Sequence, residues 1–166
     1  TAAGSRLLEV WLASPTLDPS AIGGRLDLVE AFRAEPLEVA ALRDCLGRTR
    51  DLERIVGRLQ NRIRNPRELA GIRDTLRELP EIARVLERFA APAVAEARDQ
   101  LDLLPGLRDQ LERTLADEPP AQLKDGNVIR KGFDEELDRL RSAGSNARRW
   151  MADLESAERE RTGIRN

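Results

Sequence analysis

The feature that most constrains the fold is an apolar stripe near the end of the sequence. Apolar or small residues recur there in alternating steps of four and three, at Phe133, Leu137, Leu140, Gly144, Ala147, Met151 and Leu154. This spacing keeps one face of an α-helix turned toward a partner. It predicts a helix from Phe133 to about Arg161, roughly 40 Å long at about 1.5 Å per residue, with Gly163 at a left-handed cap position. Little of the chain is left to cover its far end, as in a piece excised from a larger protein.

Proline and capping residues divide the preceding sequence into further helices. Ser14-Pro15 breaks a first short helix, because proline disfavours helix at the residue before it. Asp18-Pro19 supplies the cap and the first turn of the next helix. Asn65-Pro66-Arg67-Glu68 has the form of a capping box, in which the Asn65 side chain accepts from the Glu68 amide and Glu68 reaches back. These signals predict helices that start and stop at defined residues.

The middle of the sequence continues in the same way. Pro80 and Pro92 are each expected in the first turn of a further helix. Leucines from Leu101 to Leu115 mark another helix, interrupted near Pro105-Gly106. Only Asn127–Arg130 reads as extended, because a β-branched pair lies between two glycines. We therefore predict an all-α multi-helix bundle with one long projecting lever helix and at most one short extended segment near 127–130. The expected domains are a helical core at 1–132 and the lever helix at 133–166.

Composition excludes most kinds of catalysis. The chain of 166 residues fits one domain and has no histidine, so Ser-His and Cys-His nucleophile pairs are impossible. A zinc or iron site would have to be built from one cysteine and carboxylates. That residue, Cys45, lies on an apolar stripe, which favours a small core residue over a reactive thiol.

Two further patterns carry no chemistry of their own. The glycines from Gly126 to Gly132 are spaced somewhat like a phosphate loop, but no Gly-Lys-Ser/Thr follows them. The acidic cluster Glu135, Glu136 and Asp138 fits a solvated first helical turn, favoured by the helix dipole, better than an acid-base role. We expect no catalytic, cofactor-binding or metal-binding residue in this chain.

Arginine is concentrated in one part of the sequence. Between Arg48 and Arg77, nine arginines face four acids, and Arg54, Arg58 and Arg62 share one helix face. These side chains could follow phosphates, but the net charge is -2 and the chain has three phenylalanines, two tryptophans and no tyrosine to stack on bases. A solvated face is therefore the preferred interpretation. No signal-like segment and no run of about 18 apolar residues is present, so we expect a cytoplasmic protein with no membrane partner.

Several long segments resemble one protein family. The opening TAAGSRLLEVWLASPTLDPSAIGGRLDLV, the middle DLERIVGRLQNRIRNPRELAGIRDTLRELP and the later DEPPAQLKDGNVIRKGFDEELDRLR with ERERTGI are similar, in order, to the helical core or lever domain (domain III) of the bacterial mismatch-recognition ATPase MutS. The resemblance covers nearly the whole chain. Ala3 stands where the family usually has methionine and Thr16 where it usually has leucine. Both departures affect packing, and neither touches a functional group.

The resemblance implies a mechanical role in DNA mismatch repair. In that family the core domain links the mismatch-binding domain and the clamp to a distant ATPase domain, and the long helix is the outgoing lever toward the clamp. It implies that ATP and magnesium, mismatched double-stranded DNA, a second MutS subunit and a MutL-type partner all bind through other parts of the parent protein. It also implies a bacterial, nucleoid-associated location. No catalytic or base-contacting position of the family maps onto these residues, so we expect no enzyme activity here.

A second hypothesis comes from a different class of protein. The chain could be a free-standing helical adaptor that binds partner proteins through the exposed face at Met151 and Leu154. The reading frame beyond Asn166 distinguishes the two hypotheses. Clamp strands, a returning helix and a phosphate loop downstream would favour the first, and a stop codon would favour the second.

Overall fold

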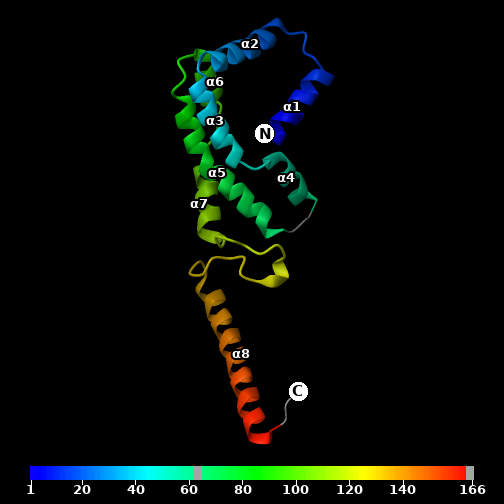
Figure 1. The fold of residues 1–166 in the computed structure, drawn as a ribbon, viewed down its shortest axis with the longest axis vertical. Coiled ribbons are helices and arrows are strands. Elements are labelled where there is room, and N and C mark those ends of the chain that lie inside the picture. Colours follow the sequence, from blue (N-terminus) through cyan, green and yellow to red (C-terminus); the bar gives the residue numbers. More distant parts are fainter. Residues whose placement is uncertain (62–64, 164–166) are drawn as a thin grey trace. The chain divides into compact units, whose positions relative to one another are not determined.

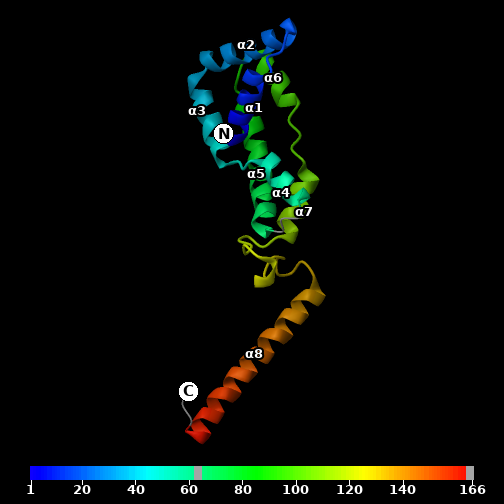
Figure 2. The same cartoon turned by 90° about the vertical axis from the view of Figure 1, so that its right-hand side faces the viewer.

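The computed structural model describes residues 1–61 and 65–163, which fall into two units, Thr1–Val128 and Ile129–Asn166. The described residues form an all-α fold without a strand (Figure 1 and Figure 2). Its α-helices are α1 (Ala2–Ala13), α2 (Pro19–Ala34), α3 (Pro36–Arg48), α4 (Leu52–Gln60), α5 (Pro66–Leu86), α6 (Pro92–Asp99), α7 (Pro105–Thr114) and α8 (Glu135–Thr162). A short 3-10 helix, η1, spans Leu123–Asp125. The predicted fold class is confirmed.

Within the first unit, most helix ends lie where short sequence signals predict them. Helix α1 ends at Ala13, just before Ser14-Pro15, and the Asp18 side chain caps α2 by accepting from the Ser20 N–H at 2.9 Å. Prolines occupy the first position of α2, α3, α5, α6 and α7, where the missing N–H has no intrahelical partner to lose. Proline and capping residues therefore account for these boundaries.

The capping box at the start of α5 is only half formed. The Asn65 side chain accepts from the Arg67 N–H at 3.0 Å, not from the Glu68 amide. The Glu68 carboxylate does not reach back, because it pairs with Arg58 of α4 at 2.7 Å. An ion pair to a neighbouring helix has replaced the predicted local bond, which no pattern within four residues reveals.

The expectation for Pro80 is wrong, since this residue lies inside α5 and does not begin a new helix. An internal proline removes one backbone hydrogen bond and costs about 3 kcal/mol or more. Burial offsets this cost, because Leu76 before the proline is 1% exposed and Val85 after it is also 1% exposed. Continuous packing on both sides of Pro80 holds the 21-residue helix together.

The interruption predicted near Pro105 is present. Leu104 has a left-handed backbone with φ of 44°, and Asp102 accepts its N–H at 2.9 Å. Helix α7 starts only after this turn, so Leu101 lies outside it. The segment expected to be extended at 127–130 forms no strand, and Asn127 is also left-handed, with φ of 54°.

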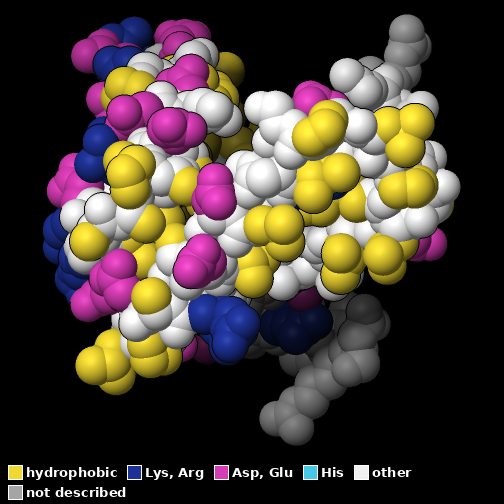
Figure 3. Space-filling model, turned by 90° about the horizontal axis from the view of Figure 1, so that it is seen from above, with side chains coloured by type: hydrophobic (Ala, Val, Ile, Leu, Met, Phe, Trp, Pro, Cys, Tyr) yellow, Lys and Arg dark blue, Asp and Glu magenta, His cyan; other side chains and the backbone are white. Residues whose placement is uncertain are grey.

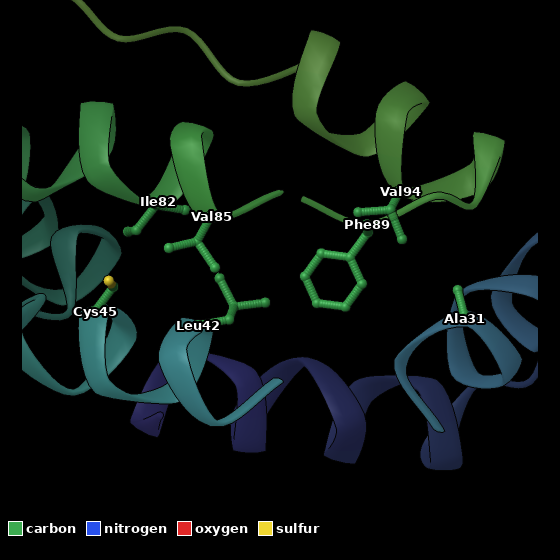
Figure 4. Packing of buried hydrophobic residues seen from close by; sticks show 7 residues of the cluster. All are labelled: Ala31, Leu42, Cys45, Ile82, Val85, Phe89 and Val94. Carbon is green, nitrogen blue, oxygen red and sulfur yellow. The ribbon is translucent and has the colours of Figure 1, made fainter. Parts of the chain in front are cut away.

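The first unit has one main apolar core, between α2, α3, α5 and α6 (Figure 4). Phe89 packs edge-on against Phe32 of α2, with ring centroids 5.4 Å apart. Cys45 is 4% exposed within this core, which confirms its interpretation as a packing residue. The buried members of the cluster are Ala31, Leu42, Cys45, Ile82, Val85, Phe89 and Val94.

Helix α1 contributes no buried residue to this unit. Leu8 and Leu12 are exposed, and Trp11 is covered on one face by the Arg25 guanidinium, whose carbon lies 3.7 Å from the ring centroid. Seen from above, hydrophobic side chains are gathered over part of the surface (Figure 3). Apolar surface is thus left uncovered in the first unit as well as on α8.

Helix α8 forms most of the second unit and is one uninterrupted helix of 28 residues. Asp134 caps its start by accepting from the Leu137 N–H at 2.7 Å. Gly163 ends it with φ of 68°, donating its N–H to the Arg159 carbonyl at 2.9 Å. The predicted span of Phe133 to about Arg161 was correct within two residues. Among the described residues, no helix combines the length and the apolar character needed to cross a membrane.

Candidate functional site

The chain between α7 and the end of the first unit is bound to α5 by a buried arginine. Arg73 is 3% exposed, and its two terminal nitrogens donate to the carbonyls of Ala116 at 2.8 Å and Asp117 at 2.9 Å. Its Nε donates to Asp74 at 2.9 Å. A buried guanidinium with all its directions used is a strong, geometrically specific contact. Arg73 therefore fixes the main chain after α7 to the middle of α5.

Two further contacts extend this attachment. Arg67 Nε donates to the Pro119 carbonyl at 3.3 Å, and the Ala116 N–H donates to the Val128 carbonyl at 2.9 Å. Pro119 is buried. Val128 is the last residue of the first unit, so the loop after α7 is hydrogen-bonded to the segment that ends this unit.

The start of the second unit is bound in the same manner to α8. Arg141 donates to the Ile129 carbonyl at 3.0 Å, and the Gly132 N–H donates to the Asp138 carboxylate at 2.6 Å. Arg141 and Asp138 also pair with each other at 3.3 Å. Of the predicted acidic cluster, Glu135 and Glu136 are exposed as expected, but Asp138 orders the chain that enters the helix. The sequence alone did not assign this role to Asp138 or to Arg141.

Most of the apolar stripe of α8 is exposed, and among its leucines only Leu137, near the start of the helix, is partly buried in the described part of the chain. Leu140 is 63% exposed, Met151 is 55% exposed, and Leu154 and Trp150 are exposed as well. Covering a side chain of this size stabilises a structure by about 1.5–3 kcal/mol. The helix therefore has a face suited to pack against another helix, as the four-and-three spacing predicted.

Helix α1 is joined to α4 by ion pairs. Arg6 pairs with Asp51 and, at 2.6 Å, with Glu53 at the start of α4. The Arg6 guanidinium hydrogen-bonds the charged carboxylate and so lowers the pKa of Asp51 to about 2. Asp51 also caps α4 by accepting from the Arg54 N–H at 3.2 Å. Since α1 buries no residue, this charge contact is a large part of what holds it.

Among the described residues, no three His, Cys, Asp or Glu side chains gather where they could hold a metal ion. Gly126 and Gly132 have positive φ values of 69° and 87°, and serve turns. The start of α8, where a phosphate could otherwise sit, is occupied by the Asp134 side chain.

These features define a class of all-helical domain in which arginine side chains, one of them buried, order the main chain and a long capped helix presents an exposed apolar face. The model of the family described as MutS domain III matches residues 1–163. The chain belongs to the MutS domain III family, as its resemblance indicated.

Curated relatives agree with this assignment over the whole chain. The chain is 41% identical over 166 residues to the DNA mismatch repair protein MutS of Symbiobacterium thermophilum, covering 100% of this chain and 19% of the relative. It is 40% identical over 166 residues to the protein of the same name from Geobacillus thermodenitrificans, covering 100% and 18%. A third, from Methanothrix thermoacetophila, is 40% identical over 168 residues, covering 100% and 20%. The chain spans about a fifth of the length of the curated relatives it matches.

Proposed function

We propose that this chain couples the DNA-holding parts of a MutS-type mismatch repair protein to its ATPase domain. The observation that carries the proposal is α8, a 28-residue helix capped at both ends. Its Arg141 and Asp138 side chains bind the main chain of the segment that leads into the helix. A stiff helix with an ordered start can carry a displacement along its length, whereas a flexible start would absorb it. Its uncovered stripe would be packed against a returning lever helix of the same parent protein.

In this proposal the two parts of the chain have different tasks. Residues 1–132 form the core, and residues 133–166 form the outgoing lever toward the clamp. Buried Arg73 supports this division, because it orders the main chain that leads from α5 and α7 to the lever. The core would hold the main chain that leads up to Val128, and the lever would carry movement along its own length.

The chemistry lies with the rest of the parent protein. ATP and magnesium would bind in its ATPase domain, and mismatched double-stranded DNA in its reader and clamp. A second MutS subunit and a MutL-type partner would assemble with the parent, in the bacterial cytoplasm near the nucleoid. This chain itself would catalyse no reaction, since it offers neither a histidine nor a phosphate loop. The free-standing adaptor is not favoured by any observation, because the relatives carry the name MutS.

The first test uses the 166-residue chain itself. Purified chain should hydrolyse no ATP above background and should bind matched and mismatched duplexes equally at moderate salt. ATP turnover, or preference for the mismatched duplex, would show that this chain itself takes part in ATP hydrolysis or mismatch recognition, against the proposal. A variant with Arg73→Met serves to check that any weak activity depends on the folded chain.

The second test uses the parent protein with two proline substitutions in α8. Leu140→Pro removes a hydrogen bond inside the helix, whereas Glu135→Pro lies at the first helical position, which tolerates proline. Leu140→Pro should abolish most of the stimulation of ATP turnover by mismatched DNA, while basal turnover and mismatch affinity change little. Glu135→Pro should behave as wild type. If both variants keep the stimulation, or if Leu140→Pro lowers basal turnover and affinity without changing the coupling, α8 is not the lever.

A further inference from the structure

The structure separates the nine arginines between Arg48 and Arg77 into different groups. Three of them are paired with carboxylates on other helices: Arg48 with Glu78 at 2.8 Å, Arg58 with Glu68 at 2.7 Å and Arg77 with Glu112 at 2.7 Å. Arg73 binds main-chain carbonyls, as described above. Arg62 and Arg64 lie outside the described residues. This leaves Arg50, Arg54 and Arg67, which form no ion pair within the described part of the chain.

These three side chains line the same hollow of the first unit, together with Arg58. The hollow has a volume of about 960 Å³ and lies between α4, the first half of α5, the turn at 49–51 and the loop at 118–127. Helices α4 and α5 lie side by side in both ribbon views (Figure 1 and Figure 2). Arg54 and Arg58 are one turn apart on α4, and Arg67 lies in the first turn of α5. Arginines that are far apart in sequence thus converge on one space.

Arg50 is held at the hollow by its main chain and its stem. Its N–H donates to the Thr75 hydroxyl at 2.8 Å. The stem of the Arg50 side chain lies beside Gly71, where an added Cβ would be 3.5 Å from it, an ordinary contact distance. The main chain of Arg50 is therefore held at the edge of the hollow, and its exposed side chain extends from there.

Arg58 borders the hollow but is already neutralised. One of its terminal nitrogens pairs with Glu68 at 2.7 Å. Its Nε is buried and has no hydrogen-bond partner among the described residues, and a buried atom is out of reach of a ligand in the hollow. Binding of an anion would therefore depend on Arg50, Arg54 and Arg67.

The carboxylates that also line the hollow limit what it can bind. Asp51 is paired with Arg6, Asp74 with Arg73 and Glu68 with Arg58, so these charges are neutralised locally. Glu118 and Asp125 form no ion pair in the described residues and lie in the loop that borders the hollow. With so little excess positive charge, the hollow fits one small anion better than a long polyanionic track.

We propose that this hollow is a phosphate-binding site formed by Arg50, Arg54 and Arg67. Guanidinium groups match the geometry of phosphate oxygens and bind them by charge-assisted hydrogen bonds. None of the described residues that line the hollow is aromatic, so the site would recognise phosphate and not a base. The phosphate is either a free or terminal phosphate or a diester of a DNA backbone. This site does not depend on the coupling role proposed above.

The experiment follows the Nε–H resonances of Arg50, Arg54 and Arg67 in the ¹⁵N-labelled 166-residue chain by NMR. Inorganic phosphate is titrated in one arm and a short blunt DNA duplex without terminal phosphates in the other, both at low salt. A saturable shift of these resonances is expected in at least one arm. A shift with phosphate alone assigns the site to free or terminal phosphate, and a shift with the duplex assigns it to the backbone.

Variants of matched charge distinguish the site from general attraction to basic residues. Arg54→Gln should weaken binding about tenfold, the effect of losing one charged hydrogen bond. Arg139→Gln removes the same charge from α8, where Arg139 contacts Glu135 and Glu136, and should leave the affinity unchanged. Glu118→Gln should strengthen binding. The proposal is overturned if neither ligand shifts the Nε–H resonances of the three arginines, or if Arg54→Gln and Arg139→Gln weaken binding equally.

Discussion

The unit Thr1–Val128 and the helix α8 are stabilised in different ways. The first unit encloses side chains such as Leu76, Val85 and Val94 that are almost fully buried, whereas none of the 28 residues of α8 is buried. Helix α8 relies on its caps and on exposed pairs such as Arg159–Glu155 at 2.6 Å, each of which contributes a few tenths of a kcal/mol. The comparison shows that one chain can combine a part stabilised by its own core with a part whose apolar face is made for a partner.

The largest expected effect compares two leucines, one from each part. Leu76→Ala should destabilise the chain by about 2–5 kcal/mol, because it leaves a cavity beside α5. Leu140→Ala should change stability by about 0.5 kcal/mol or less, since its side chain is already in water. Urea unfolding followed by circular dichroism measures both. Equal losses would mean that α8 is packed in solution, and the contrast between the two parts would disappear.

The next effect concerns arginines on the same helix. Arg73→Met should destabilise the first unit by about 1–3 kcal/mol, because the Ala116 and Asp117 carbonyls lose their buried donor. Arg84→Met removes an exposed arginine paired only with Glu81 and should cost less than about 1 kcal/mol. Hydrogen exchange at residues 116–128 should rise in Arg73→Met and stay at the wild-type rate in Arg84→Met. Unchanged exchange in both would show that Arg73 does not order this segment.

The smallest effect is the pH dependence of the contact between α1 and α4. The pKa of Asp51 falls from 3.8 to about 2 on folding, so its contribution to stability is present above about pH 4 and is lost as the pH falls toward 2. Asp51→Asn keeps a capping side chain but removes the charge. It should be less stable than wild type at neutral pH, and the difference should shrink as the pH falls from about 4 to 2 and vanish below 2.

A second substitution tests the cause of this dependence. In an Arg6→Met background, Asp51→Asn should have little effect at any pH, because the partner that lowers the pKa is gone. Thermal unfolding across this pH range gives the comparison. A difference between Asp51→Asn and wild type that is constant from neutral pH to pH 2 would exclude the ion pair as its origin.

The parts of the fold that were predictable depend on neighbours in the sequence. Asp18-Pro19, Ser14-Pro15 and Gly163 each act through their own backbone angles or through the next few residues, and the structure places all three as expected. Pro80 was misplaced because its outcome depends on how well α5 is packed on both sides of it. The capping box was only partly predicted for a similar reason, because the Glu68 carboxylate pairs with Arg58 of the neighbouring helix.

The candidate sites were less predictable than the helices. The apolar stripe on α8 could be predicted because residues spaced four and three apart lie on one face of a helix. Most of that face is exposed in the structure. The roles of Arg73 and Arg141 were not visible, because each binds main-chain carbonyls that any sequence would provide. The arginine-rich stretch was recognised, but which of its members are paired depends on carboxylates as distant as Glu112.

The helical class, most helix boundaries, the length of α8 and the family could all be read from the amino-acid order, because they follow from short-range backbone preferences and from ordered similarity along the chain. Helix packing sets which arginines are neutralised, which bind main-chain carbonyls and which converge on a hollow. Pairing of charges requires atoms to come within a few ångströms, and for residues 30 to 50 positions apart that distance is set by helix packing.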